Sequence, residues 1–344
     1  LNKKSFLALF LTVALVFACV GCSEDSSVDD NGEYETSTTQ EARSQEVESS
    51  PVTTPSSAVR GLSISVDNKT GLLNISRMTP EVVGEIGDSG VWTIFVYMCG
   101  TDLETNYGMG TGDIAEMCAA SDSDNVRFVV ETGGTYEWQN SAVESESIQR
   151  FVVQHGAIEA VDEQLRTSMG SASTLSDFLL WGVENYASEH MGVVLWDHGG
   201  GSVTGICFDE RENYDSLSLA ELDEALYTYY GQRGRRFDFI GFDACLMGTV
   251  ETANILATYA DYMYGSEETE PGSGWDYTTI GDFLASNPDA DGLMLGKVVC
   301  DSFLAACKAQ NDDNLTTLSV IDLGNIDTLL DAFNIFASGM YNVS

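Results

Sequence analysis

The feature that most constrains the fold is a regular alternation of short apolar runs with amphipathic segments, which starts near Val91. The runs are rich in Val, Ile, Phe and Tyr, as are strands that lie buried inside a parallel sheet. The segments between them have the apolar period of helices that cover such a sheet. The pattern predicts an α/β fold with a mostly parallel sheet and helices on both of its faces. We expect strands at residues 92–99, 126–131, 148–154, 192–197, 237–243, 262–265 and 317–322, and helices at residues 173–187, 218–230, 248–257 and 292–308.

Two of the expected strands are followed by residues that can perform covalent chemistry. His198 follows the strand at 192–197 and precedes three glycines, and Cys245 follows the strand at 237–243. In open parallel sheets, ligands bind outside the carboxyl ends of the strands, so a base and a nucleophile would meet there. We also expect Cys245 to lie at the entry to the next helix, whose dipole would stabilise the thiolate. Either residue alone is more often structural, but the pair predicts a thiol hydrolase.

Four segments around these residues resemble the clostripain-like cysteine peptidases, which are relatives of the caspases, gingipains and legumains. They read WTIFVYMCGTDLE at 92–104, VLWDHGGG at 194–201, IGFDACLMG at 240–248 with Glu251 after it, and SEETEPGSGWDY at 266–277. They follow one another in the order of the family. The resemblance implies a caspase-like three-layer sandwich that hydrolyses bonds in peptide or protein substrates.

Carried onto this chain, the resemblance assigns the catalytic roles to His198 and Cys245. It implies that Cys245 attacks the scissile carbonyl, and that His198 protonates the leaving amine and then helps to activate water. The backbone N–H groups of Gly199 and Cys245 would form the oxyanion hole. This chemistry requires no cofactor, although the acidic loops offer ligands for calcium, on which some relatives depend.

The resemblance also implies a pocket for a substrate Arg or Lys beside the nucleophile. Asp243 matches the family's acidic residue two positions before the cysteine, and a buried carboxylate there would pair with a guanidinium. The alternative is that Asp243 only caps the following helix. Many relatives carry a second acidic residue where this chain has Ser273. Asp276, Glu268 or Glu270 could replace it, and the sequence leaves the strictness of the preference open.

The loop between the His198 and Cys245 strands is the expected place of self-processing. Family members are often activated by cleavage in this loop. Here it contains a polar stretch, residues 209–213, with one basic residue. The resemblance therefore implies self-cleavage after Arg211.

Residues 1–22 have the pattern of an export signal that ends in a lipid-attachment site. Two lysines precede an apolar run at residues 6–20, which is too short for a comfortable membrane span. Cys22 is the expected site of lipid attachment, and Cys19 is the alternative. We expect the protein to be exported and anchored by lipid to a bacterial cell envelope, facing outside the cytoplasm.

Composition divides the rest of the chain into three parts. Residues 23–60 are rich in Ser, Thr and acidic residues, lack apolar periodicity, and are expected to form a disordered tether. Residues 61–90 form a transition, and residues 91–344 are expected to form the caspase-like peptidase domain. Because the helical pattern after Leu323 still runs at Ser344, we expect the chain to continue beyond this residue.

The charge and the cysteines exclude other classes of function. A formal net charge of −39 argues against a basic face for nucleic acid and favours a cationic substrate or partner. The six cysteines after residue 22 are too scattered for a disulfide scaffold. The C-x-x-C at residues 19–22 has no second pair of ligands at zinc-site spacing, so we expect no metal there.

Two other functions compete with peptidase activity. The glycines after His198 also resemble the oxyanion loop of certain esterases, but the chain contains no G-x-S-x-G nucleophile elbow. The second competitor is a surface lipoprotein that kept the fold and acts as a binding or adhesion module. This second function predicts that His198 and Cys245 are dispensable.

Overall fold

The computed structural model describes residues 61–67, 72–78, 87–311 and 316–343. All of them lie in one compact unit, Ser56–Ser344. The expected export signal, the lipid-attachment site Cys22 and the tether at 23–60 lie outside the described residues. None of the helices within the described ranges is long and apolar enough to cross a membrane.

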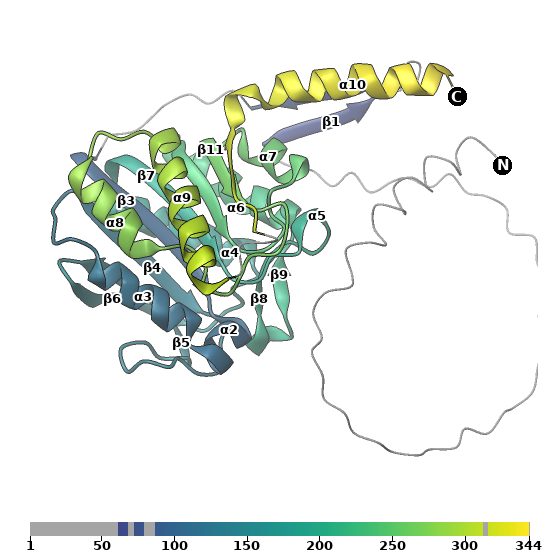
Figure 1. The fold of residues 1–344 in the computed structure, drawn as a ribbon. Coiled ribbons are helices and arrows are strands. Elements are labelled where there is room, and N and C mark those ends of the chain that lie inside the picture. Colours follow the sequence, from purple (N-terminus) through teal and green to yellow (C-terminus); the bar gives the residue numbers. More distant parts are fainter. Residues whose placement is uncertain (1–60, 68–71, 79–86, 312–315, 344) are drawn as a thin grey trace, which may run out of the picture. The chain divides into compact units, whose positions relative to one another are not determined.

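An eight-stranded sheet forms the centre of this unit (Figure 1). Its strand order is β12-β11-β10-β7-β3-β4-β5-β6, and the strands from β11 to β4 run parallel. Strand β12 at one edge and strands β5 and β6 at the other run antiparallel to their neighbours. The strands are β3 (Asp88–Cys99), β4 (Val126–Gly133), β5 (Ser147–Gln154), β6 (Ala157–Leu165), β7 (Ser188–Trp196), β10 (Phe237–Asp243), β11 (Ala260–Gly265) and β12 (Ser319–Asp322).

Helices cover both faces of the sheet (Figure 1). Strand β3 shows how the sequence produces this arrangement, because Phe95 and Tyr97 enter the core on one face while Ile94 and Val96 enter the core on the other. The first core contains α4 (Ala172–Tyr186), α6 (Leu219–Arg233) and α7 (Val250–Leu256), and the second contains α3 (Met109–Ala119), α8 (Tyr277–Ser286) and α9 (Gly292–Gln310). The predicted α/β fold, a three-layer sandwich around a mostly parallel sheet, is confirmed.

Shorter elements surround this body. Two hairpins pair antiparallel strands, one formed by β1 and β2 and the other by β8 and β9. The remaining elements are β1 (Leu62–Val66), β2 (Leu73–Arg77), α2 (Thr101–Tyr107), α5 (Gly201–Thr204), β8 (Ile206–Asp209), η1 (Glu210–Glu212), β9 (Asp215–Leu217), η2 (Leu323–Asn325) and α10 (Ile326–Val343).

The seven predicted strands are all present, with ends that differ by a few residues. Strand β6 was not predicted, because it is a largely exposed edge strand without buried apolar positions. Helices α2, α3 and α8 were not predicted either. Their apolar residues are interrupted by glycines and polar residues, so the helical period was weak.

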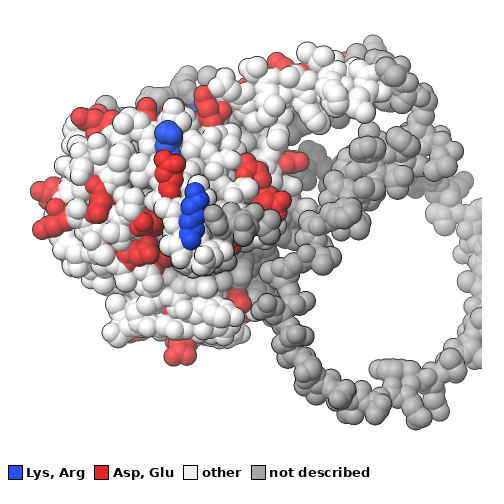
Figure 2. Space-filling model, viewed as in Figure 1, with Lys and Arg blue, Asp and Glu red and all other residues white. Residues whose placement is uncertain are grey.

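The surface agrees with the acidic composition. Figure 2 shows acidic side chains scattered over the displayed face, with few basic ones among them. In the part of the chain that the structure describes, no group of three or more His, Cys, Asp or Glu could hold a metal ion.

Candidate active site

Three neighbouring strands, β10, β7 and β3, end side by side, and each is followed by a residue with catalytic potential. Cys245 follows β10, His198 follows β7 and Asp102 follows β3. Gly199 brings the first two loops into contact, since a Cβ atom on it would lie 2.1 Å from the carbonyl oxygen of Cys245. The structure thus brings together the loops that carry His198, Gly199 and Cys245, and any side chain at position 199 would separate them.

The imidazole of His198 is paired with a carboxylate that the sequence did not reveal. Its Nε2 lies 2.9 Å from Oδ1 of Asp102, and the two side chains are 44% and 38% exposed. The neighbouring Thr101 is buried, and its hydroxyl donates a hydrogen bond to Asp197, the residue before His198. This bond ties the start of α2 to the end of β7. The backbone therefore holds Asp102 and His198 at a fixed separation.

Asp197 is a structural carboxylate beneath the site. It is buried, and besides the Thr101 hydroxyl it accepts a hydrogen bond from the amide of Phe208. Burial raises the pKa of Asp197 to about 7, and the nearby His198 opposes this shift. Asp197 thus links three segments around the candidate active site.

Cys245 lies in a turn, so the prediction that it begins a helix was wrong. Helix α7 starts at Val250, and Thr249 caps it by accepting a hydrogen bond from Thr252. Leu246 has a φ of 65°, a left-handed conformation that a helix does not continue through. The macrodipole of α7 therefore does not act directly on the thiol, because its effect is confined to the first turn.

The thiol instead contacts the loop that follows β11. The amide of Glu270 donates to Sγ of Cys245 at 3.3 Å. The backbone next to it is held as well, because the amide of Leu246 donates to the carbonyl of Glu268 at 2.9 Å. A backbone N–H aimed at the sulfur stabilises a thiolate by hydrogen bonding to the charged form. This contact takes the place of the expected helix dipole.

Asp243, the last residue of β10, is buried beside the thiol loop. Its Oδ2 accepts hydrogen bonds from the amide of Trp275 at 3.2 Å and the hydroxyl of Tyr277 at 3.0 Å. Burial raises the pKa of Asp243 to about 7. Because Thr249 caps α7, the alternative that Asp243 serves only as a helix cap is wrong. Within the described ranges no Lys or Arg forms a salt bridge with this carboxylate.

The other two residues predicted to bind substrate have different surroundings. The Oγ of Ser273 is buried without a hydrogen-bond partner. It is followed by Gly274, where a Cβ atom would lie 3.1 Å from Oδ1 of Asp243. Asp276 is the N-cap of α8, and its two oxygens accept from the amide and the hydroxyl of Thr279 at 2.8 and 2.6 Å. Ser273 thus precedes Gly274, the residue that lies against Asp243. The carboxylate of Asp276, in contrast, is occupied in capping α8.

Arg211 lies in η1, between the two strands of the β8–β9 hairpin. Its guanidinium pairs with Glu146 at 3.0 Å and donates to the carbonyl of Ser145 at 2.7 Å. It also lies over the ring of Tyr136, 5.4 Å from the centroid. The predicted self-cleavage site is therefore held in an ordered turn, and not in an extended loop.

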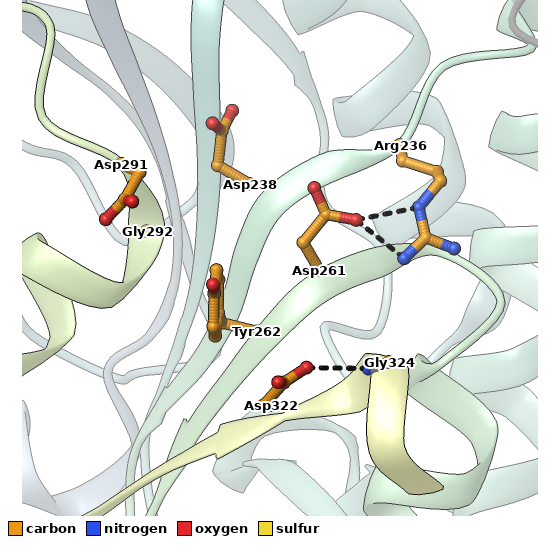
Figure 3. A pocket seen from close by; sticks show the side chains of 8 residues that line it. All are labelled: Arg236, Asp238, Asp261, Tyr262, Asp291, Gly292, Asp322 and Gly324. Carbon is orange, nitrogen blue, oxygen red and sulfur yellow. Dashed lines mark hydrogen bonds and ion pairs between the residues drawn. The ribbon is translucent and has the colours of Figure 1, made fainter. Parts of the chain in front are cut away.

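A separate cavity of about 340 Å³ lies at the opposite end of β10 and β11 (Figure 3). Four of the eight residues that line it are aspartates. Figure 3 shows that one of them, Asp261, points toward Arg236. Each of these carboxylates already has a partner: Asp238 with His190, Asp261 with Arg236, Asp291 with the amide of Met294, and Asp322 with the amide of Gly324. The cavity is remote from Cys245 and does not contribute to the candidate active site.

Comparison with known proteins identifies similar chains. Residues 96–344 match the profile of the Clostripain family. Clostripain from Hathewaya histolytica is 27% identical over 150 residues, which make up 38% of this chain and 28% of that protein. The match thus spans less than a third of the length of that relative.

Solved structures of cysteine proteases share the fold. A secreted C11 cysteine protease from Bacteroides thetaiotaomicron superposes with a TM-score of 0.55 at 18% identity, covering 70% of this chain and 68% of that one. An inactive zymogen of a C11 protease from Parabacteroides distasonis superposes with a TM-score of 0.52 at 22% identity, covering 69% and 63% of the two chains.

Proposed function

The chain belongs to the clostripain family, and on that premise we propose that it is a cysteine endopeptidase that hydrolyses peptide bonds with His198 and Cys245. The observation that carries the proposal is the contact of the two strand-end loops at Gly199, where the backbone meets the carbonyl of Cys245. The proposal is tested by following the thiol-dependent hydrolysis of fluorogenic peptides that carry Arg, Lys or an uncharged residue at P1.

In the proposed reaction the Cys245 thiolate attacks the scissile carbonyl carbon and forms a tetrahedral intermediate. The N–H groups of Gly199 and Cys245 stabilise the negative charge that develops on the carbonyl oxygen. His198 then donates a proton to the leaving amine, and the C–N bond breaks to leave an acyl-enzyme. Water, activated by the same imidazole, attacks the thioester and releases the acid product and the thiol.

The P1 pocket is proposed to lie around Asp243. This carboxylate is buried close to the nucleophile, and its Oδ1 faces Gly274. A buried carboxylate without a cation is unfavourable, and the guanidinium or ammonium of a substrate would relieve this. A preference for Arg or Lys at P1 follows.

Asp102 is proposed as a positioning residue for His198. The pairing of Nε2 with Asp102 leaves Nδ1 to serve the leaving amine. Substitution Asp102→Asn is expected to lower kcat about 10-fold with little change in KM, a modest effect because solvent screens a half-exposed pair. The measurement is steady-state hydrolysis of a P1 Arg peptide.

The control for this prediction is Asp238→Asn, because Asp238 forms a similar pair with His190 at 2.8 Å, away from the thiol. This variant should keep the wild-type kcat, and Asp102→Glu should restore part of it. An equal loss of kcat in the Asp238 and Asp102 variants would show that the pair at His198 has no special role.

Self-processing after Arg211 is the third element of the proposal. Because Glu146 and Tyr136 hold the Arg211 side chain, the hairpin must open before the bond can be cut. Wild-type protein is expected to convert with time into two fragments, while Cys245→Ala and Arg211→Ala proteins keep a single band on denaturing gels. Identical single bands for the wild type and Cys245→Ala would exclude self-processing under those conditions.

We also propose that the protein is exported and anchored through lipid on Cys22. The charged and apolar segments of residues 1–22 support export. The solved relative from Bacteroides thetaiotaomicron is described as secreted. An anchored peptidase would act on peptide or protein substrates outside the cytoplasm, and the net charge of −39 speaks against a nucleic-acid partner.

A further inference from the structure

Glu270 is an unusual residue because its carboxylate is buried and unbonded. Neither Oε1 nor Oε2 has a hydrogen-bond partner within the described part of the chain. The indole N–H of Trp275 lies close enough to lower the pKa of this carboxyl, but outside the geometry of a full hydrogen bond. Burying a charge without a partner is strongly unfavourable, and proteins rarely retain such a group without a function.

The position of Glu270 links it to both parts of the candidate active site. Burial raises the pKa of its carboxyl, and the negative charges of Asp243 and Cys245 raise it further, so all three groups lie within electrostatic reach of one another. The backbone amide of the same residue donates to Sγ of Cys245 at 3.3 Å. One residue therefore contacts the nucleophile with its backbone and carries a carboxylate without a hydrogen bond within electrostatic reach of Asp243.

Together these groups form a set of buried acceptors without a cation. The two oxygens of Glu270 and the Oγ of Ser273 have no hydrogen-bond partner, and the carboxylate of Asp243 accepts from Trp275 and Tyr277 but pairs with no Lys or Arg of the described residues. A planar guanidinium offers five N–H donors, which suits several acceptors on two carboxylates. Within the described residues no Lys or Arg fills this role, so a cation from outside the chain would complete the set.

We propose that Glu270 is the second carboxylate of the P1 pocket and that it couples binding of the P1 cation to placement of the Cys245 thiol. The inference rests on the proposed peptidase function. A P1 guanidinium that pairs with the Glu270 side chain fixes the backbone of the same residue. It thereby holds the N–H donor on Sγ, so that part of the P1 binding energy appears in kcat as well as in KM.

The test is the variant Glu270→Gln, which keeps the size of the side chain and removes its charge. For a P1 Arg peptide, kcat/KM is expected to fall about 10- to 100-fold, the range for losing a hydrogen bond to a charged group, with kcat sharing the loss. For the same peptide with citrulline, the neutral isostere of Arg, the change should stay below about 2-fold.

The matched control is Glu268→Gln, in the same loop, because the side chain of Glu268 is exposed. This variant should keep the Arg-to-citrulline ratio of the wild type. Glu270→Gln should also have a Tm no lower than that of the wild type, since it replaces a carboxyl whose ionisation burial disfavours with a neutral amide of the same size. An equal loss on the Arg and citrulline peptides, or a loss confined to Glu268→Gln, would overturn the inference while leaving the peptidase proposal intact.

A binding measurement decides the question independently of turnover. Agmatine, which carries a guanidinium, is titrated calorimetrically into Cys245→Ala protein with and without Glu270→Gln. The second substitution should weaken binding about 10-fold or more. Unchanged affinity, or no agmatine binding to either protein, would refute the role of Glu270 even if the wild type hydrolyses peptides. If Glu270→Gln weakens agmatine binding as expected but the wild type hydrolyses no peptide, only the peptidase proposal is refuted.

Discussion

Cys245→Ala protein is expected to lose at least about 10⁴-fold in kcat/KM on every peptide, the loss typical of removing a covalent nucleophile. The fold should be unaffected, because Cys245 lies in a partly exposed turn outside the two hydrophobic cores. The measurement is fluorogenic peptide hydrolysis, with thermal unfolding of the same samples to confirm that the variant is folded.

The matched control is Cys300→Ala. Cys300 likewise forms no disulfide and is partly buried, but it lies in α9, where its Sγ contacts the carbonyl of Leu318. This variant should keep wild-type activity. If Cys245→Ala retains the activity of the wild type, the nucleophile lies elsewhere. If folded wild type has no thiol-dependent activity at all, the binding or adhesion function becomes the better account.

Asp243→Asn is expected to lower kcat/KM for a P1 Arg peptide about 100- to 1,000-fold, because the charged partner of a buried guanidinium is removed. The citrulline peptide should be nearly unaffected. Asparagine can still accept hydrogen bonds from Trp275 and Tyr277, so the loop should remain in place. The control is Asp276→Asn, since asparagine is as good an N-cap as aspartate.

Asp243 should also make the KM of the wild-type protein for a P1 Arg peptide depend on pH. The pKa of Asp243 is about 7, so its carboxyl is mostly protonated below pH 7 and must release a proton to bind a cation. KM for the P1 Arg peptide should therefore rise up to about 10-fold per pH unit below pH 7, and KM for the citrulline peptide should not. A parallel rise for both peptides would contradict this assignment.

The raised pKa of Asp243 also determines how the stability of the fold changes with pH. The pKa of Asp243 is higher in the folded than in the unfolded chain, so the folded state binds the extra proton between about pH 4 and pH 7. The contribution of the Asp243 carboxyl to the stability of the folded state is present at low pH, and it is lost as the pH rises through 7. Asp243→Asn should therefore raise Tm more at pH 8 than at pH 5.

The sheet could be predicted because strands such as Phe237–Asp243 are buried on both faces and read as continuous apolar runs. Strand β6 could not, because an exposed edge strand carries no such signal. The start of α7 was misplaced because the conformation of Leu246 depends on the partner loop, whose Glu268 carbonyl binds its amide. Such long-range bonds have no local pattern.

The residues of the candidate site could be chosen from the sequence because a histidine and a cysteine each follow the end of an expected strand. His198 and Cys245 follow strong strands, and family motifs surround them. Asp102 was missed because an acidic residue early in a helix usually needs no other explanation. Only the strand order β10-β7-β3 places it beside His198, and the sequence does not give that order. The proposed choice of Glu270 over Glu268 and Asp276 rests on which carboxylate is buried and without a hydrogen bond, and the sequence shows neither property.

Covalent labelling tests the central claim most directly. Wild-type protein is treated with a peptidyl-arginine chloromethyl ketone, and the modified residue is identified by mass spectrometry. None of the six described cysteines forms a disulfide, so they act as internal controls for one another. We predict a single adduct on Cys245 that excess agmatine suppresses. The absence of an adduct on Cys245, or equal labelling of Cys118 and Cys300, would contradict the assignment of Cys245 as the nucleophile beside a pocket for a basic side chain.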